Sequence, residues 1–521
     1  MLIKHFTTVS FYTILSRISG YVRDIFIAKY LGAGPLSDAF LIALRVPNFF
    51  RRFFAEGALN SAFIPLFSRQ LETEGREAAK RFAEEIFVLL FITLVIFSSV
   101  FMLFMPYLIY LIAPGFSQNP ETQGLVVELT RITFPYLMLI SIATLFAGIL
   151  NSISKFASVA FMPVLFNIAI IFAMLVLGQF FSSLVHAMAW GVFLAGILQI
   201  IWMIYFLHKN GWIIALKFRA LKLSANVREF LRKVMPTAVG GSVVQINLWV
   251  DMMVASFFSG AVTYLYYADR ISQLPLSIVG TAMGTALLPL LSRKLGAGEI
   301  AEANKIHETG LEVVMLLTLP ATFALVVLHS DIMTILFQRG EFTAENAAAA
   351  SYALVAFSLG LPAFALVKIF ATSFFALKDT KTPVVSACIA MVVNVILNIT
   401  FVLTLKHFGY MPHIGIALAT ACSSWVNATM LGTKLFRTTH FSLSRQFVVR
   451  MGKIIISTVA MTAILIFSII ALEVTTMNLA IKIISGGGTY VAMILLLKTF
   501  DLNELKTYLT RKKGKAPKAV S

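Results

Sequence analysis

Charged residues are scarce in this chain, and that scarcity decides what class of protein it is. Only 13% of the 521 residues are Asp, Glu, Lys or Arg, whereas 59% are hydrophobic, and the mean hydropathy is +0.87. An average soluble domain carries about twice that share of charged residues. The composition therefore excludes a soluble protein and indicates a polytopic membrane protein.

Cysteine is almost absent, and the usual motifs of enzymes are missing. Cys388 and Cys422 both lie in apolar stretches without the spacing of a redox or metal pair, so we expect buried thiols and no disulfide. The eight histidines make no H-E-x-x-H or similar spacing. We therefore predict no catalytic residue, no metal site and no cofactor. We also expect no nucleic-acid partner. The net charge of +18 would suggest one in a soluble protein, but in a membrane protein the basic residues between the apolar runs indicate its orientation.

Apolar runs of about 20 residues predict about fourteen transmembrane helices. The basic residues cluster in every second connection: residues 209–233 hold seven Lys or Arg, whereas 113–124 and 179–185 hold none. The positive-inside rule then places both termini in the cytoplasm. Arg17 interrupts the first apolar run and no small-residue cleavage site follows, so we expect a retained helix and not a signal peptide. The predicted helix centres lie near residues 19, 50, 98, 138, 168, 196, 246, 276, 318, 362, 394, 424, 461 and 490.

A faint internal repeat suggests how these helices are grouped. The words Ile64-Pro65-Leu66 and Ser68-Arg69 recur 224 residues later as Leu288-Pro289-Leu290 and Ser292-Arg293, although chance matches are common in Leu-rich sequence. Six spans per half, both entering from the cytoplasm, indicate a parallel repeat around a central cavity. The predicted fold is an all-α polytopic membrane protein with an N-lobe at 1–208 (helices 1–6), a C-lobe at 209–437 (helices 7–12), helices 13–14 at 438–500 and a basic cytoplasmic tail at 501–521.

The first two predicted spans contain an unusual number of charged side chains. Each costs about 2.5 to 3.5 kcal/mol at the bilayer centre, so such groups normally face a watery cavity or a partner. In the second span the spacings of 7, 7 and 4 bring four of them within about 40° of one another on a helix. Pro47 is expected to kink or break that helix. The charged residues are Arg17, Arg23, Asp24, Asp38, Arg45, Arg51, Arg52 and Glu56, and the stripe is Asp38, Arg45, Arg52 and Glu56.

The second half of the chain adds Asp269, Arg270 and a lone Lys368 deep in an apolar run. Arginine suits a phosphate because its planar fork donates two parallel hydrogen bonds, and lysine adds a mobile point charge. Because three separate segments supply cations, we predict an anionic cargo. The acidic residues would keep the empty cavity near neutrality. The alternative is that these groups are structural ion pairs or snorkel from span ends. That alternative applies most to Arg45 and Arg51, and least to Lys368.

Two pairs of polar residues recur at i,i+4 spacing within predicted spans. Asn247 and Asp251 lie in the seventh span, and Asn394 and Asn398 in the eleventh. Such oxygen atoms are suitable ligands for a coupling cation such as Na⁺. Interhelical hydrogen bonding is the alternative that we favour.

Several short sequence motifs, spread along nearly the whole chain, resemble those of one known family. These motifs are Ser16-Arg17, Gly20, Arg23-Asp24, Gly32-Ala33-Gly34, Asp38-Ala39-Phe40, Pro47-Asn48, Arg51-Arg52, Ala55-Glu56-Gly57-Ala58, Ile132-Thr133-Phe134-Pro135-Tyr136, Tyr266 to Arg270, Gly284-Thr285, Leu288-Pro289, Leu336-Phe337, Gly340, Phe342-Thr343 and Lys381-Thr382-Pro383. With them the chain resembles the MurJ (MviN) family of bacterial lipid II flippases.

The resemblance implies a fourteen-helix transporter of the multidrug/oligosaccharidyl-lipid/polysaccharide exporter superfamily in the bacterial cytoplasmic (inner) membrane. It implies that lipid II, an undecaprenyl-diphosphate glycolipid used in peptidoglycan synthesis, crosses to the outer leaflet by alternating access. Helices 13–14 would form a groove for the lipid tail, and the other partners would be membrane lipids and cell-wall synthesis proteins. The implied substrate-binding residues are Arg17, Arg23, Asp38, Arg51, Arg52, Glu56, Asp269, Arg270 and Lys368, supported by Asp24 and Asn48.

Other functions compete with this interpretation. The nearest are a flippase for another polyprenyl-diphosphate-linked glycan and a small-cation exporter of the same superfamily. A membrane enzyme acting on polyprenyl phosphates would need an acidic metal site or a nucleophile–base pair, and the sequence contains no such motif. A non-transporting scaffold for cell-wall enzymes would tolerate neutralisation of the buried charges.

Overall fold

The computed structural model describes residues 2–54, 58–218, 224–240, 242–282, 287–438 and 441–499. These residues are almost entirely helical, and the one isolated β-bridge among them joins Arg339 to Phe342. The chain divides into two compact units. The first contains residues 1–264 and the loop 337–346, and the second contains 265–336 and 347–521.

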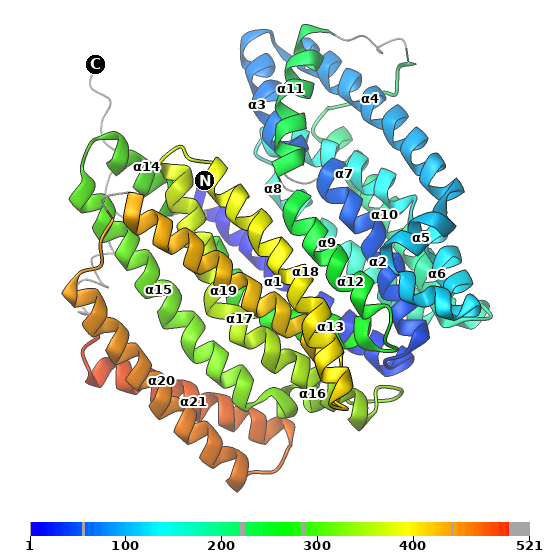
Figure 1. Ribbon diagram of the computed structural model, residues 1–521. Helices are drawn as coiled ribbons and strands as arrows, with labels where there is room; N and C mark the ends of the chain where they lie inside the picture. The colour runs from blue at the N-terminus through cyan, green and yellow to red at the C-terminus, as the bar shows by residue number, and fades with distance from the viewer. Residues whose placement is uncertain are drawn as a thin grey trace. The chain divides into compact units, whose positions relative to one another are not determined.

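The first unit is built mainly from the first twelve α-helices (Figure 1). Within it α2 packs on α6, α10 packs on α7 and α9, and α1 packs on α9. The helices are α1 (Leu2–Leu31), α2 (Pro35–Phe54), α3 (Ala58–Thr73), α4 (Arg76–Leu103), α5 (Met105–Ile112), α6 (Pro120–Thr133), α7 (Tyr136–Ser152), α8 (Phe156–Ala160), α9 (Met162–Leu175), α10 (Leu184–Lys209), α11 (Ala225–Gly240) and α12 (Ser242–Ala255), with 3₁₀ turns η1 (Pro114–Gln118) and η2 (Leu177–Phe180).

The second unit contains the remaining helices, of which α13 begins in the first unit and enters the second after Tyr264. Within it α18 packs on α19, α20 packs on α21, and α15 packs on α20. The helices are α13 (Ala261–Ala282), α14 (Leu288–Gly296), α15 (Ile300–Val327), α16 (His329–Phe337), α17 (Ala344–Ala376), α18 (Lys381–His407), α19 (His413–Thr438), α20 (Arg445–Ala471) and α21 (Thr476–Leu496).

All fourteen predicted span centres fall inside helices. In the described part of the chain, ten helical stretches are long and apolar enough to cross a membrane. The predicted centres near 19, 50, 246 and 276 lie in α1, α2, α12 and α13, which are not among these ten. These helices carry the charged residues or are short, so they are the spans that hydropathy identifies least well. The all-α polytopic fold is confirmed, and the count of fourteen stays a prediction.

The helix break that was expected at Pro47 is absent, because α2 continues through this proline to Phe54. Proline has no N–H, so the carbonyl of Ala43, four residues earlier, loses its helical donor. The hydroxyl of Thr133 on α6 donates to that oxygen over 2.6 Å. A side chain of a neighbouring helix thus replaces the missing bond, which is how membrane helices tolerate proline.

The two copies of the sequence repeat occupy similar local positions. Residues 64–69 lie on α3, which follows α2, and residues 288–293 lie on α14, which follows α13. Each copy is therefore on a shorter helix after a long one. The predicted lobe boundary after residue 208 falls within the first compact unit. The compact units are defined by packing, whereas the predicted lobes at 1–208 and 209–437 concern the transport cycle. The lobes therefore stay a prediction.

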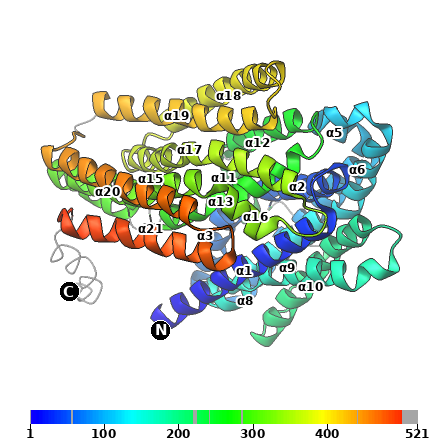
Figure 2. The same ribbon diagram turned by 90° about the horizontal axis from the view of Figure 1, so that it is seen from below.

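The last two helices pack against each other and against α15, as Figures 1 and 2 show. Buried Met461, Leu465 and Leu479 form their contact with the end of α15 at Leu328. A buried ion pair adds to this contact, because the ammonium of Lys482 lies 2.7 Å from a carboxylate oxygen of Asp331 on α16. Helices α20 and α21 are therefore fixed to the second unit by both apolar and ionic contacts.

The two cysteines and the asparagine pair at 394 and 398 were also subjects of prediction. Both cysteines are free, as expected, but they are half-buried and not fully buried. Asn394 Nδ2 on α18 donates to the hydroxyl of Thr420 on α19 over 3.3 Å, and Asn398 Nδ2 donates to Asn394 Oδ1 over 2.8 Å. The first bond joins α18 to α19 and fits the interhelical role that we favoured, and the second lies within α18.

Candidate functional site

The predicted site residues fall in both compact units, and each set is described within its own unit. In the first unit they lie on α1 and α2, and in the second on α13 and α17. Glu56 lies outside the described residues. The first set is Arg17, Arg23, Asp24, Asp38, Asn48, Arg51 and Arg52, and the second is Asp269, Arg270 and Lys368.

Arg23 is buried in a hydrogen-bond network between α1 and α9. Its Nε and Nη2 donate to Oδ1 of the adjacent Asp24 over 3.0 and 2.7 Å, and its Nη1 donates to Oδ1 of Asn167 over 3.0 Å. Asn167 in turn donates to the hydroxyl of Ser19 over 2.9 Å. The guanidinium carbon also lies 5.7 Å from the ring centre of Phe166, within cation–π range. Two of these bonds stay within α1, and the bond to Asn167 joins α1 to α9.

Arg17 lies on the same helix but in a different environment. Arg17 is exposed, whereas Arg23 is 6% exposed and Asp24 is completely buried. In the structure Asp24 accepts two hydrogen bonds from Arg23, because the two side chains need only rotate toward each other from neighbouring positions. Arg17 is thus the more accessible cation of α1.

Asp38 is fully buried at the N-terminal end of α13, where its carboxylate accepts three hydrogen bonds. Oδ2 accepts from the N–H of Gly260 over 2.7 Å, and Oδ1 accepts from the N–H and the hydroxyl of Thr263 over 2.9 and 2.6 Å. The first N–H groups of a helix have no partner within the helix, and a carboxylate there is also favoured by the helix dipole. Asp38 therefore acts as a cap supplied by another part of the chain.

The other predicted residues of α2 lie toward its C-terminal end. Asn48 Nδ2 donates to the carbonyl of Leu44 over 2.8 Å, so the side chain returns to its own helix. Arg51 is half-buried and Arg52 is exposed. Because Arg52 lies one helical turn after Asn48, its charge is presented near the end of the helix, where a cation is also favoured by the dipole.

In the second unit Asp269 and Arg270 are half-buried on α13. Gln273 Nε2 donates to Asp269 Oδ1 over 3.1 Å, one turn along the same helix. Lys368 is exposed on α17, and the described residues provide no ion pair to its ammonium group. A lysine in the middle of an apolar helix, with its charge on the surface and no acid beside it, is suited to meeting an anion from outside the chain.

The sequence interpretation missed several charged and polar residues that the packing makes important. Asp331 and Lys482 form the buried pair between α16 and α21, and Arg450 Nη1 on α20 donates to Glu312 on α15 over 3.0 Å. Each is a charge inside or beside an apolar run, which is the signal that identified Lys368. Asn167 gave no such signal, because a single Asn in an apolar helix is common.

Comparisons with known proteins agree along the chain. A family model described as "Lipid II flippase MurJ" matches residues 27–485. The "Probable lipid II flippase MurJ" of Rhizobium meliloti (strain 1021) is 40% identical over 470 residues, which are 89% of this chain and 86% of the relative. The "Lipid II flippase MurJ" of Burkholderia cenocepacia is 34% identical over 418 residues, which are 80% of this chain and 81% of the relative.

Solved structures give the same result. A structure described as "Lipid II flippase MurJ, inward closed conformation" has a TM-score of 0.77 at 27% identity and covers 97% of this chain and 99% of its own. An inward-facing multidrug resistance MATE family transporter of the MOP superfamily has a TM-score of 0.67 at 16% identity, covering 81% of this chain and 94% of its own, and is similar in fold alone. Because the family model spans most of the sequence and relatives above 30% identity span four fifths of it or more, the chain is a multi-pass membrane protein that belongs to the lipid II flippase MurJ family.

Proposed function

We propose that the protein is a lipid II flippase, which moves the undecaprenyl-diphosphate-linked peptidoglycan precursor from the cytoplasmic to the outer leaflet. The observation that carries this proposal is the family match over residues 27–485, together with relatives named lipid II flippase along nearly the full length. The protein is thus a transporter and not a catalyst. No covalent bond of the cargo changes, so the protein needs to bind, shield and release a charged headgroup.

The cargo's diphosphate is the group that the predicted cations would hold. Arg17 and Arg52 are exposed in the first unit, and Lys368 is exposed in the second, so all three are accessible to a ligand. Arginine offers two parallel charge-assisted hydrogen bonds to a phosphate, and lysine adds a mobile point charge. Arg51, Glu56, Asp269 and Arg270 complete the proposed substrate-binding set.

Arg23, Asp24, Asp38 and Asn48 enter the proposal mainly through the helices that they hold. The guanidinium of Arg23 is committed to Asp24 and Asn167, and the carboxylate of Asp38 is committed to Gly260 and Thr263. A direct contact of either with cargo would first require these bonds to open. We therefore assign them a positioning role in this conformation, and cargo contact in another state of the cycle.

Transport would proceed by alternating access, with the lobes at 1–208 and 209–437 rocking around the headgroup. The polyprenyl tail would remain in lipid along helices 13–14 at 438–500, whose outer faces are strongly apolar and exposed. This division of labour keeps the charged group in a hydrated cavity and the apolar group in hydrocarbon. Each elementary charge that crosses is worth about 2.3 kcal/mol per 100 mV of membrane potential.

The cellular setting follows from the same chemistry. The membrane would be the bacterial cytoplasmic membrane, both termini would face the cytoplasm, and the partners would include cell-wall synthesis proteins that make or use lipid II. The basic segment at 209–233 supports this orientation. A reporter active only in the cytoplasm, fused after residue 521, should be active, and a reporter inserted in the 179–185 loop should be inactive.

Leaflet-resolved lipid II transport tests the function. The full chain is expressed in cells depleted of their own flippase, beside the variants Arg17→Ala, Arg270→Ala and Lys368→Ala at equal membrane levels. We expect the parent to transport lipid II and each variant to lose most of this activity. Arg437→Ala, which removes an exposed arginine at the end of α19, is the matched control and should transport normally.

The possible results separate the competing functions. A correctly inserted parent that moves no lipid II would contradict the cargo assignment and favour another glycolipid or a scaffold role. Normal transport by all three variants would instead show that these three cations are dispensable, while leaving the flippase function intact.

A further inference from the structure

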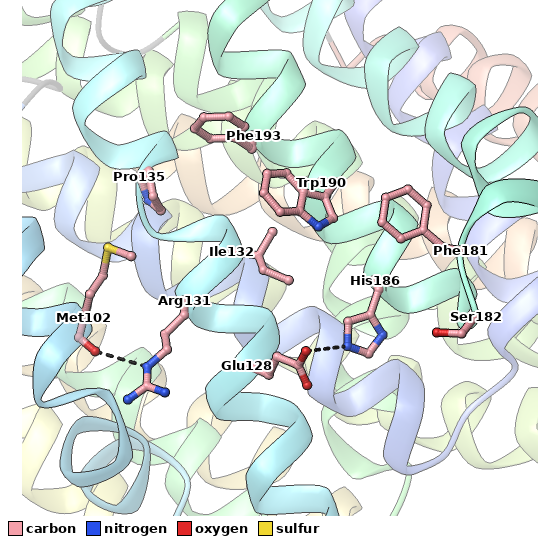
Figure 3. A pocket seen from close by; sticks show the side chains of 10 residues that line it. All are labelled: Met102, Glu128, Arg131, Ile132, Pro135, Phe181, Ser182, His186, Trp190 and Phe193. Atoms are coloured by element: carbon pink, nitrogen blue, oxygen red, sulfur yellow. Dashed lines mark hydrogen bonds and ion pairs between the residues drawn. The ribbon is translucent and has the colours of Figure 1, made fainter.

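A second candidate place for a ligand lies in the first unit, and none of the predicted substrate-binding residues lines it. A cavity of about 610 Å³ lies between α6 and the start of α10, with Met102 of α4 at its edge (Figure 3). This volume falls in the usual range for small-molecule sites, which is about 300 to 1,000 Å³. Its walls come from one unit alone, so its shape does not depend on the other.

A proline interrupts the helix that forms one wall. Pro135 lines the cavity and has no N–H, so the carbonyl of Arg131 loses its helical donor and α6 ends at Thr133. The chain resumes as α7 at Tyr136. The interruption places the last turns of α6, with Glu128 and Arg131, along the cavity wall.

The two charged residues of this wall are held apart. Glu128 and Arg131 are at i,i+3 on α6, a spacing at which opposite charges commonly pair with each other. Instead, Nε2 of His186 lies 3.3 Å from the Glu128 carboxylate, and Nε of Arg131 donates to the carbonyl of Met102 over 3.1 Å (Figure 3). Within the described residues, the terminal amino groups of Arg131 make no hydrogen bond. The cavity thus presents a separated cation and anion.

The remaining wall is aromatic and lies next to segments predicted to face the outside. Trp190 and Phe193 of α10 and Phe181 before it line the cavity, and Trp190 is 44% exposed. The neighbouring segments 113–124 and 179–185 contain no Lys or Arg, which places them on the outer side. Tryptophan is enriched in membrane proteins at the level of the lipid headgroups.

We propose that this cavity binds the headgroup of a zwitterionic phospholipid of the outer leaflet. The phosphate would accept hydrogen bonds from Arg131, the ammonium group would lie against Glu128, and the first acyl carbons would pack on Trp190 and Phe193. A headgroup with both charges fits because the site offers both partners at fixed separation. The proposal depends on the orientation of the protein in the membrane, and it is independent of the cargo's identity.

The test measures lipid binding by the purified full chain with native mass spectrometry. The probes are phosphatidylethanolamine, which carries both charges, and phosphatidylglycerol, which carries only the negative one, with matched acyl chains. We expect the parent to prefer phosphatidylethanolamine. Arg131→Gln should weaken binding of both lipids about tenfold, because a charge-assisted hydrogen bond is lost. Glu128→Gln should abolish the preference while leaving phosphatidylglycerol binding unchanged.

Two matched controls separate the cavity from general lipid binding. Glu121→Gln removes an exposed acid from the first turn of the same helix, and Arg437→Gln removes an exposed arginine that lines another cavity in the second unit. Both should retain the parent's preference. Equal binding of the two lipids by the parent, or an unchanged preference in Glu128→Gln, would overturn the proposal. The Glu128→Gln result decides even if Arg131→Gln fails to fold, because amide for carboxylate keeps the shape of the side chain.

Discussion

The hydroxyl of Tyr490 on α21 donates to the main-chain carbonyl of Leu316 on α15 over 2.8 Å. That carbonyl lies four residues before Pro320, which has no N–H to donate to it. The last helix of the protein thus supplies a hydrogen bond that α15 cannot make within itself. Thr133 does the same for the carbonyl of Ala43 in α2, which Pro47 leaves without a donor.

Tyr490→Phe should destabilise the protein modestly, by about 0.5 to 1.5 kcal/mol, because the freed carbonyl of Leu316 loses its donor. Unfolding in mixed micelles measures the change. In a Pro320→Ala background the helix regains its own donor, so Tyr490→Phe should then cost much less. An equal cost in both backgrounds would show that the hydroxyl acts through something other than this carbonyl.

The ion pair between Lys482 and Asp331 should be far more sensitive to single substitutions. Both residues are buried, at 1% and 5% exposure, so Lys482→Met or Asp331→Asn leaves the partner's charge or polar group uncompensated. Breaking such a pair costs about 3 to 5 kcal/mol. The double variant Lys482→Met, Asp331→Leu should recover most of the loss, since it leaves neither charge behind. A double variant as unstable as the singles would contradict this account.

Asp38→Ala should lower stability by about 1 to 3 kcal/mol, because the N–H groups of Gly260 and Thr263 are left buried without an acceptor. Thermal unfolding of the purified protein would detect the change. Glu72→Ala, which removes an exposed acid near the end of α3, is the control and should shift stability little. A transport defect without any loss of stability in Asp38→Ala would instead favour direct contact with cargo.

Arg23 and Asn167 should be energetically coupled across α1 and α9. The single variants Arg23→Lys and Asn167→Ala both remove the hydrogen bond from Arg23 Nη1, so the double variant should cost less than the sum. Interhelical bonds in membrane proteins couple by about 0.6 kcal/mol on average. A double-mutant cycle of unfolding free energies gives the value, and strict additivity would exclude the coupling.

Acidification should release an ion pair between α3 and α11. Hydrogen bonds from Arg69, then from Lys233, lower the pKa of Glu229 from its ordinary value of 4.5 to about 2. A carboxyl whose pKa is lowered by folding contributes stability above its unfolded value and loses it as pH falls through its folded value. The difference in unfolding midpoint between the parent and Glu229→Gln should be constant above about pH 5 and shrink between pH 4.5 and about 2.

Salt provides the control for this pH dependence. Because the pair is partly exposed, 1 M salt should reduce the difference between parent and Glu229→Gln at every pH. A difference that grows as the pH falls would contradict the assignment.

The sequence predicted the helices well and the partners of the charged residues poorly. The apolar runs located helices at all fourteen predicted centres, because backbone groups in lipid must be satisfied within the segment itself. The charged positions of α1 and α2 were also visible as costly exceptions. Of the kink or break expected at Pro47, the break is absent, because Thr133 of another helix donates to the carbonyl that the proline leaves without a donor.

What the sequence by itself determined is local: which segments are helical and apolar, and where charge enters them, because hydrophobic burial and helix periodicity act over neighbouring residues. Only the tertiary structure decided which charged side chains are buried in hydrogen bonds and which are exposed. It buries Arg23 against Asp24 and Asn167, caps α13 with Asp38 and leaves Lys368 exposed. The physical reason is that Asn167 and Gly260 lie far along the chain from Arg23 and Asp38, so their distances are set by packing, which no spacing along one helix encodes.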